Sequence, residues 1–598
     1  MNNLRPTIPS GAGAVRRSVS GVALILTLGN AAVTQAAEYD RVIVFGDSIS
    51  DSGNYATKAP TGAGKFTTNP DDVWVEIVAK GLGLDLKPHA MGGGNYAEGG
   101  ARVALQRPDA PGNLTRRPVT EQVADFMAND GKLTRNSLVI IQGGGNDVFS
   151  TKFNGPTDTP ADLEVLRVAA EGLADQIDNL IKAGAGTVAT TSVPKFDQYN
   201  ERYDAALASR GLNVLYVDMA GLIAEIETAP AEFGITNTTS RACRGFALES
   251  FTCLPKDYVE ANANRTYLYA DGVHFTGVVH EIEGDATLAM LRAPLQIAQL
   301  PHMLLTTNRA TGQLARERMD AASRNPVPGW RLIGGTQLVD GDATRQGKAD
   351  GTIVQAGFER GFSSALTAGS YLSWHHGNGD FADDRGALSI DSYSLQGFAT
   401  LQHGRIAADF TAAIGRANLS DIERKVMLGP ALRIEQGGTD SDFLTAETRI
   451  GVDALPGPLR IAPFLSLRYD RISVDGYAER GDRSTQVTYA GQKLETLEAA
   501  VGVRFSSGEA WRGIIPALEL GYAGDVLNHT QKVAILPHGA PVWYTSQQVG
   551  ASDDAFFYGL TATIPVTTQS AVNLGVRGRS AGNGQNSLSG GISLSLGF

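Results

Sequence analysis

The sequence predicts two domains of different fold class: an α/β domain of parallel strands and helices, followed by an all-β membrane barrel. Three observations predict this arrangement. The chain has 598 residues, too many for one ordinary hydrophobic core. Up to about residue 300, short apolar runs alternate with helical patterns. From about residue 327 onward, apolar residues alternate with small or polar ones, which is the period of a β-strand.

The first 37 residues have the pattern of an export signal. Arg16 and Arg17 supply positive charge, VALILTLG (22–29) forms a short apolar core, and TQAA (34–37) offers small residues for cleavage. The apolar run is too short to cross a bilayer as a helix. The rest of a twin-arginine pattern is missing, so we expect ordinary secretion. We therefore assign residues 1–37 to a signal peptide.

Charge and cysteine content narrow the possible partners. The net charge of −12 argues against a nucleic-acid partner. The only two cysteines, Cys243 and Cys253, lie close together and suit one small disulfide loop, with two buried free thiols as the alternative. The export signal favours the disulfide. No CxxC or Cys/His spacing predicts a metal site.

Residues 38–300 predict a parallel sheet with helices on both faces. Helical spacing of apolar residues occurs between the strand-like runs, for example in DLEVLRVAAEGLADQIDNLIKAG (162–184). In such sheets, ligands bind at the carboxyl ends of the strands. The other predicted helices are DVWVEIVAKGLG (72–83) and VTEQVADFM (119–127), and the strands are RVIVF (41–45), SLVIIQ (137–142), GTVATTSV (186–193) and LNVLYVDM (212–219).

A helical segment is expected between the two domains, in residues 301–326. The stretch HMLLTTNRATGQLARERMDAASRN (302–325) is compatible with a helix and more polar than a core helix. It is either a simple linker or a plug in a polar barrel lumen. The second interpretation is slightly favoured because the first barrel-like strand follows directly.

Residues 327–598 predict a membrane barrel. In NSLSGGISLSLGF (586–598), Leu and Ile residues share one face and Ser residues the other, and roughly a dozen such segments follow one another. A soluble β-sandwich is the alternative. Segment lengths near ten residues, an apolar face opposite a small or polar one, and a final Phe favour an outer-membrane barrel. A closed barrel also satisfies every backbone group in lipid.

Ser48 is the first candidate for chemistry. It follows a buried strand in VIVFGDSISDSGN (42–54), where a serine is usually a turn residue or a helix cap. The motif is not the G-x-S-x-G elbow of α/β-hydrolases. A nucleophilic serine also needs a base, an orienting acid and oxyanion donors. Asp47 and Asp51 flank the serine and are expected to order the loop rather than to supply that acid.

One histidine has the spacing that a catalytic base needs. Of the three histidines in the α/β region, only His274 lies three residues after an aspartate, Asp271, so that one turn can present both side chains. An Asp/His pair in a loop is otherwise ordinary surface polarity. His89 and His280 lack a carboxylate at this spacing, and His280 is expected to be structural.

Two glycine-rich loops offer hydrogen-bond donors. GGGNYAEGGA (92–101) supplies the Gly99 N–H, and QGGGNDVF (142–149) supplies the Asn146 amide. With the Ser48 N–H these would make three donors for an oxyanion. The loops can also be plain turns, and spacing does not decide between Gly99 and Gly100.

Four short motifs together resemble a known family. FGDSISDSGN, NYAEGG, GGGND and DGVH occur in the order of the blocks of SGNH or GDSL hydrolases. With the export signal and the barrel, the chain resembles the GDSL autotransporter esterases of Gram-negative outer membranes. The resemblance implies a flavodoxin-like α/β/α sandwich as passenger and a twelve-stranded barrel threaded by a helix. It also implies Ser48 as nucleophile, Asp271 and His274 as its partners, and Ser48, Gly99 and Asn146 as the oxyanion hole.

The resemblance further implies a function. By this resemblance, the passenger is expected to be a serine carboxylic ester hydrolase. It would act through an acyl-enzyme on an ester or lipid substrate, with no metal or organic cofactor. The passenger would stand at the cell surface, and the barrel would contact outer-membrane lipid and the barrel-assembly machinery. No nucleic acid is expected as a partner, and the chain is expected to be a monomer. Alternatives are a carbohydrate O-deacetylase, a lysophospholipase, or a surface adhesin without catalysis.

Overall fold

The computed structural model describes residues 39–106, 116–151, 159–245, 249–324, 327–455, 457–527, 530–548, 554–582 and 584–598. The expected signal peptide, residues 1–37, lies outside the described residues. No helix in these ranges combines the length and the apolar character needed to cross a membrane.

The first half is built on a parallel sheet, as the alternation of strands and helices predicted. Its strands are adjacent in the order β1–β2–β3–β4, and all three neighbouring pairs are parallel. Val44 lies opposite Ile140, and Ile140 lies opposite Ala189. The bounds are β1 (Arg41–Phe45), β2 (Ser137–Ile141), β3 (Thr187–Thr191) and β4 (Leu215–Val217).

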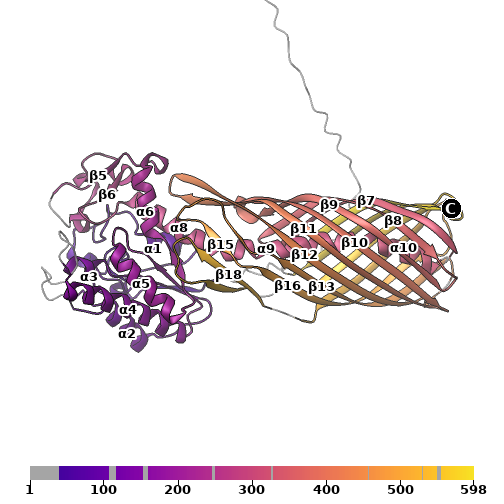
Figure 1. Ribbon diagram of the computed structural model, residues 1–598, viewed down its shortest axis with the longest axis horizontal. Helices are drawn as coiled ribbons and strands as arrows, with labels where there is room; N and C mark the ends of the chain where they lie inside the picture. The colour runs from indigo at the N-terminus through magenta and orange to yellow at the C-terminus, as the bar shows by residue number, and fades with distance from the viewer. Residues whose placement is uncertain are drawn as a thin grey trace, which may run out of the picture. The chain divides into compact units, whose positions relative to one another are not determined.

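Alternate residues of each strand point into two separate hydrophobic cores. Val44 and Ile140 belong to one core, and Phe45 and Ile141 belong to the other. Because successive side chains of a strand face opposite ways, both faces must be covered. Figure 1 shows the helices of this half of the chain. The first core is covered by α1 (Trp74–Gly81), α6 (Met219–Thr228) and α8 (Gly277–Ile297), and the second by α2 (Val119–Asn129), α4 (Pro160–Lys182) and α5 (Asp197–Arg210).

Shorter elements surround the carboxyl ends of the strands. The helix α3 (Gly145–Ser150) begins soon after β2, and α7 (Ala263–Thr266) is a single turn. A small second sheet consists of β5 (Asn237–Arg241) and β6 (Tyr267–Tyr269), which pair in parallel. These elements place the loops from which the candidate site is built.

The second half is a closed barrel of twelve strands, which confirms the predicted fold class (Figure 1). The barrel closes where the last strand pairs with the first, with Ile592 opposite Thr336. Its strands are β7 (Gly329–Thr344), β8 (Gly347–Gly361), β9 (Leu366–Phe381), β10 (Ala387–His403), β11 (Ile406–Leu428), β12 (Ala431–Val452), β13 (Leu459–Val474), β16 (Gln492–Ser507), β17 (Ile515–Asp525), β20 (Ala555–Pro565), β21 (Ala571–Ala581) and β22 (Ser587–Gly597).

The last strand shows why the sequence alternates. Leu588 and Ile592 are half exposed on the outer surface, whereas Ser589 and Ser593 are buried toward the lumen. An apolar outer surface and a polar interior are what a barrel in lipid requires. The period of two in the sequence therefore reports the two faces of the barrel wall.

Two helices lie in the lumen. They occupy the segment that the sequence predicted to be either a linker or a plug. They are α9 (Gln299–Thr311) and α10 (Gln313–Arg324). Arg318 of α10 donates two hydrogen bonds to the inward-facing Glu359, at 2.7 and 2.8 Å. Glu317 accepts a hydrogen bond of 2.6 Å from Ser593 of the last strand. The segment therefore fills the lumen.

Two features of the barrel domain differ from the sequence-based expectation. Some strands are much longer than ten residues, and β11 has 23, so they continue beyond the length that crosses a bilayer. A separate four-stranded sheet was not expected because its strands are too short to show a period. They are β14 (Tyr477–Ala478), β15 (Val487–Tyr489), β18 (Gln531–Pro537) and β19 (Tyr544–Gln548).

Candidate active site

Ser48 lies in the tight turn that follows β1. Gly46 packs closely there: a Cβ on it would come within 2.8 Å of the Gln142 side chain, which would have to shift. The Asp47 carboxylate accepts hydrogen bonds from the Gln142 amide at 2.7 Å and from the Ile49 N–H at 3.2 Å. Burial raises the pKa of Asp47, and these hydrogen bonds oppose the rise. Asp47 therefore orders the turn, and the nearby His274 charge also lowers its pKa.

Asp271 and His274 lie in the turn that follows β6. The Asp271 Oδ1 atom accepts the N–H groups of Val273 and His274, each at 2.9 Å. These two bonds fold the turn back on itself, so that Asp271 Oδ2 lies 2.8 Å from His274 Nδ1. The D-x-x-H spacing thus brings both side chains together, because one turn presents them both, as the sequence suggested.

The three residues form one chain of hydrogen bonds. His274 Nε2 lies 2.9 Å from Ser48 Oγ, although 226 positions separate them in sequence. An ionised carboxylate can only accept, so we assign the proton to His274 Nδ1, and Nε2 then accepts from the serine hydroxyl. All three side chains are buried, with exposed fractions of 8% for Ser48, 2% for Asp271 and 4% for His274. This arrangement can activate the serine as a nucleophile.

The electrostatics of Asp271 suit an orienting carboxylate. Burial alone would raise its pKa, but the attraction of the His274 charge and hydrogen bonds from His274, Ser250 and Val273 outweigh that effect. The pKa of Asp271 is held well below its ordinary value. The carboxyl group therefore stays ionised and can hold an imidazolium ion.

The structure separates the two glycines between which the sequence did not decide. The Gly99 N–H donates to Asp51 Oδ2 at 2.9 Å, so it is already occupied. Gly100 follows in a turn closed by a bond from Ala101 N–H to Glu98 O, and its φ of +83° requires glycine. The N–H groups of Gly100 and Ser48 donate to no group in the part of the chain that the structure describes, and both residues line the same cavity. This geometry favours Gly100 over Gly99 as a donor.

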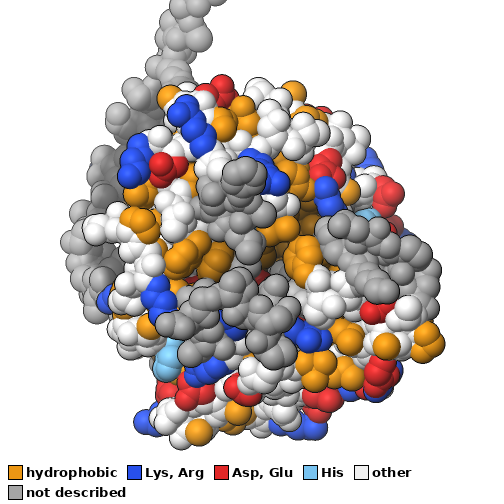
Figure 2. All heavy atoms as spheres, turned by 90° about the vertical axis from the view of Figure 1, so that its left-hand side faces the viewer, with side chains coloured by type: hydrophobic (Ala, Val, Ile, Leu, Met, Phe, Trp, Pro, Cys, Tyr) orange, Lys and Arg blue, Asp and Glu red, His pale blue; other side chains and the backbone are white. Residues whose placement is uncertain are grey.

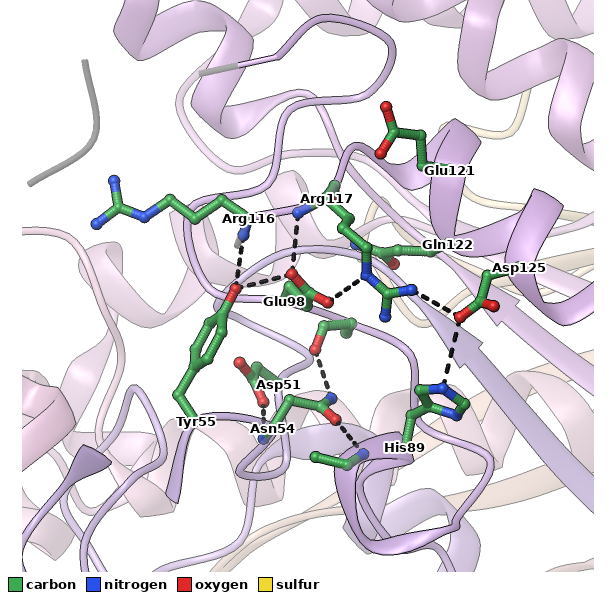
Figure 3. A network of polar contacts seen from close by, with 12 residues as sticks. Asp51, Asn54, Tyr55, His89, Glu98, Arg116, Arg117, Glu121, Gln122 and Asp125 are labelled. Carbon is green, nitrogen blue, oxygen red and sulfur yellow. Dashed lines mark hydrogen bonds and ion pairs between the residues drawn. The ribbon is translucent and has the colours of Figure 1, made fainter. Parts of the chain in front are cut away.

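A buried polar network fixes this turn from its other side (Figure 3). The Glu98 carboxylate accepts the Tyr55 hydroxyl at 2.8 Å and the Arg117 guanidinium at 2.6 Å. Arg117 also donates to Asp125 at 2.6 Å. Asp51 lies on the opposite side of the turn. Burial raises its pKa to about 7, although hydrogen bonds from three backbone N–H groups act to lower the pKa. Two carboxylates therefore clamp the loop that carries Gly100.

Asn146 reaches the same cavity from the start of α3. The preceding Gly144 has a φ of +112°, and a Cβ there would collide with the buried Tyr199 ring at 2.1 Å, so only glycine allows this turn. Asp147, next along the helix, accepts from the Arg102 side chain at 3.0 Å and the Val103 N–H at 2.9 Å. These bonds fix the first turn of α3, from which Asn146 reaches the cavity and hydrogen-bonds Asp47.

Sequence reasoning missed Ser250. Its Oγ lies 3.1 Å from His274 Nδ1, and its N–H donates to Asp271 Oδ2 at 3.2 Å. The side chain is fully buried. The Cys243–Cys253 disulfide ties this segment to the strand beside Asp271, where Cys243 N–H donates to Ala270 O at 3.0 Å. The only signal in the sequence was that Ser250 lies within the expected disulfide loop.

These groups open into a cavity of about 670 Å³. Apolar side chains form much of its wall, and Figure 2 shows hydrophobic side chains gathered around a hollow in the face turned to the viewer. Such walls suit an acyl chain or another apolar group. The apolar lining includes Ile49, Phe66, Trp74, Phe149, Val193 and Phe196.

Comparison with known proteins matches both halves to families. Residues 42–286 match the model of the GDSL-like lipase/acylhydrolases, and residues 330–577 match the autotransporter β-domain. The chain is 24% identical to Esterase EstA of Pseudomonas aeruginosa over 80% of its own length and 84% of that protein. It is also 24% identical to Lipase 1 of Photorhabdus luminescens, over 81% and 85% of the two lengths. A solved structure, the NalP translocator domain of Neisseria meningitidis, covers 49% of this chain and 97% of its own, with a TM-score of 0.41 and 17% identity.

The fold and the matched families define the class: an outer-membrane barrel that carries an acyl hydrolase at the cell surface. Within that class, residues 42–286 match the GDSL-like lipase/acylhydrolases and residues 330–577 the autotransporter β-domains, and the passenger is a carboxylic ester hydrolase.

Proposed function

We propose that the passenger hydrolyses esters through an acyl-enzyme on Ser48. The observation that carries this proposal is the unbroken hydrogen-bond chain from Ser48 through His274 to Asp271 at the wall of a cavity. Ser48 Oγ attacks the ester carbonyl while its proton passes to His274 Nε2. The tetrahedral intermediate then expels the alcohol, which takes that proton. A water molecule repeats the two steps and releases the acid.

We propose that three donors stabilise the oxyanion: the N–H groups of Ser48 and Gly100 and the side-chain amide of Asn146. Donors of this kind act best when they are fixed before the reaction begins. The clamped turn at Gly100 and the bonded first turn of α3 supply that rigidity. The family resemblance suggested Gly99, whose N–H is held by Asp51 instead.

A fluorophosphonate probe tests the acyl-enzyme step, because it phosphonylates an activated serine and stops there. In the full-length protein in outer-membrane vesicles, we expect one label per chain, found by mass spectrometry on the peptide that contains Ser48. The Ser48→Ala variant should take up no label. Continued ester hydrolysis without labelling, or labelling at another serine, would contradict the proposal.

The cavity favours an ester with an extended acyl chain over an acetylated sugar. An acetyl group needs only a small part of about 670 Å³, and apolar walls gain from contact with methylene groups. Esterase EstA and Lipase 1 carry names that agree with such a substrate. Hydrolysis rates on esters of two to twelve acyl carbons and on acetylated sugars distinguish the two. Faster cleavage of the sugars would favour the deacetylase instead.

We propose that Ser250 positions the Asp271–His274 pair. Its hydroxyl and N–H both contact this pair, and hydrogen bonding from Ser250 lowers the pKa of Asp271. Ser250→Ala keeps the N–H and removes the hydroxyl. We expect kcat to fall about 10- to 100-fold with little change in KM, because a hydrogen bond to a charged group is lost.

A double-mutant cycle distinguishes this role from a general effect on stability. If Ser250 acts through Asp271, then Ser250→Ala should cost less than about twofold in a chain that already carries Asp271→Asn. The matched control is Ser240→Ala, on the exposed strand β5, which should retain wild-type kcat. Equal losses of kcat in both backgrounds would show that Ser250 only supports the fold.

A further inference from the structure

One side of the cavity beside Ser48 is formed by the first hydrophobic core of the α/β half. Trp74, Met219 and Phe275 line the cavity and belong to that core, and Ile49 lines the cavity and packs against it. We call these four side chains the core wall. Trp74 begins α1 and Met219 begins α6, so two helices start at this wall. The wall is apolar and suits the acyl chain of an ester.

Glu283 of α8 also lines the cavity, and its exposed fraction is only 3%. Its Oε2 atom forms no hydrogen bond with any residue that the structure describes. The other two carboxylates of the cavity lining are held, Asp47 by Gln142 and Asp271 by His274. A buried carboxylate oxygen without a donor is costly, and native structures supply a donor in most cases. Glu283 is therefore open to a donor that a ligand brings.

His280 lies one turn before Glu283 on α8 and does not supply that donor. Its Nδ1 atom is 3.2 Å from Glu283 Oε2, but Nδ1 accepts the N–H of Trp74 at 3.4 Å. An imidazole that accepts at Nδ1 carries its proton on Nε2, so we assign no proton to the atom beside Glu283. The Glu283 carboxylate and the His280 ring are therefore neighbours without a hydrogen bond between them.

Close packing of α8 against α1 fixes the position of Glu283. A Cβ on Gly284 would lie 2.7 Å from Ile77 Cβ and 3.1 Å from Trp74 O, so this glycine lets the two helices approach each other. The helix α8 begins three residues after His274. The proposed base and Glu283 therefore lie on one continuous segment. A group held by Glu283 thus has a fixed place relative to the reacting atoms.

The ligand group that fits beside Glu283 is a hydroxyl. A carboxylate oxygen accepts hydrogen bonds, so the ligand must supply an O–H or N–H group. Trp74 and Phe275 of the core wall both contact His280 beside this carboxylate, so the surroundings are apolar. Entering them costs an ammonium ion far more lost hydration than it costs a neutral hydroxyl. Because the acyl chain is the part of an ester that suits the core wall, these conditions describe an acyl chain with a hydroxyl group along its length.

We propose that Glu283 selects esters whose acyl chain carries a hydroxyl group, by accepting a hydrogen bond from that group. This inference rests on the proposed function, because it places the acyl chain relative to Ser48. It names a substrate class, the hydroxylated acyl esters, and one residue that determines specificity. A plain acyl chain leaves the Glu283 carboxylate without a donor, so the competing substrate is disfavoured as well.

Nitrophenyl esters of one acyl length test the proposal: the dodecanoate, and its derivatives with a hydroxyl at the third, sixth, ninth or twelfth carbon. With the full-length protein in a neutral detergent, the best hydroxylated ester should have a kcat/KM about tenfold above that of the dodecanoate. Glu283→Leu should remove this preference, mainly by raising KM for the hydroxylated ester. Glu283→Gln keeps the shape and one acceptor oxygen without the charge, so it should keep a preference of about threefold.

The matched control is Glu281→Leu. Glu281 lies on the same helix, pairs with Arg265 and is not part of the cavity lining, so this variant should retain the wild-type preference. Equal kcat/KM values for all these esters in the wild type, or an equal fall for both kinds of ester in Glu283→Leu, would overturn the proposal. If the fluorophosphonate probe labels Ser48 while the hydroxyl gives no advantage, the Glu283 inference fails and the serine mechanism stands. Without labelling at Ser48, the proposed function itself fails.

Discussion

Replacing Ser48 with alanine is expected to lower kcat for ester hydrolysis by about 10⁵- to 10⁶-fold, which is the largest effect of any single change in the chain. The hydroxyl forms the covalent bond, and no other residue described here occupies its place beside His274 Nε2. His274→Ala should cost nearly as much, because an unactivated hydroxyl at neutral pH is a poor nucleophile.

The double variant carries the sharper test. Residues that act as one unit show losses that do not add, so Ser48→Ala combined with His274→Ala should be no slower than Ser48→Ala alone. Initial rates on nitrophenyl butyrate, measured with vesicles that lack the protein as background, give these values. Ser209→Ala removes a hydroxyl from the end of α5, where it donates to Ala206 O, and should leave kcat unchanged. Activity of Ser48→Ala within tenfold of the wild type would exclude Ser48 as nucleophile.

The regular elements of the fold could be predicted because their patterns are local. The run RVIVF predicted a strand over 41–45, and β1 is Arg41–Phe45. The helix predicted over 162–184 is α4, Pro160–Lys182, whose start is fixed by a Thr159 cap. The single helix expected over 302–325 is two helices, which meet at Gly312. Glycine weakens a helix, and the sequence alone does not say whether neighbouring contacts hold it straight.

The sequence could predict the geometry of the candidate site only where the contacts lie within one short motif. The D-x-x-H turn does so, since Asp271 binds the N–H groups of its own turn. Ser250 could not be found in this way, because its contacts with Asp271 and His274 depend on how two loops pack. The occupied Gly99 N–H has the same cause, as its acceptor Asp51 lies 48 positions away.

The supports of the site also explain why a hydrolase can work in a loop-rich region. Asp51 and Glu98 fix the oxyanion turn, and the disulfide fixes the segment that carries Ser250. None of these four side chains, of Asp51, Glu98 and the two cysteines, is part of the cavity lining. The substrate can therefore be exchanged without loosening the groups that must stay in place, which is the condition for preorganised catalysis.

Asp271→Asn is expected to lower kcat by about 10⁴-fold while KM changes little. The reason lies in the two N–H groups, of Val273 and His274, that point at the Oδ1 position. An asparagine must place its oxygen there, so its NH₂ group faces His274 Nδ1. That nitrogen then has to accept, the proton moves to Nε2, and no base remains beside the Ser48 hydroxyl.

This change of the His274 tautomer makes the prediction specific. The variant keeps the size of the side chain, so thermal unfolding of the passenger should change far less than kcat does. Asp175→Asn removes an exposed carboxylate that pairs with Arg210 at 2.8 Å on the outer face of α4, and it should keep wild-type kcat. The measurements are kcat and KM on nitrophenyl butyrate for both variants. A loss of less than about tenfold in Asp271→Asn would mean that the serine is activated without an oriented histidine, and the hydrogen-bond chain would lose its catalytic role.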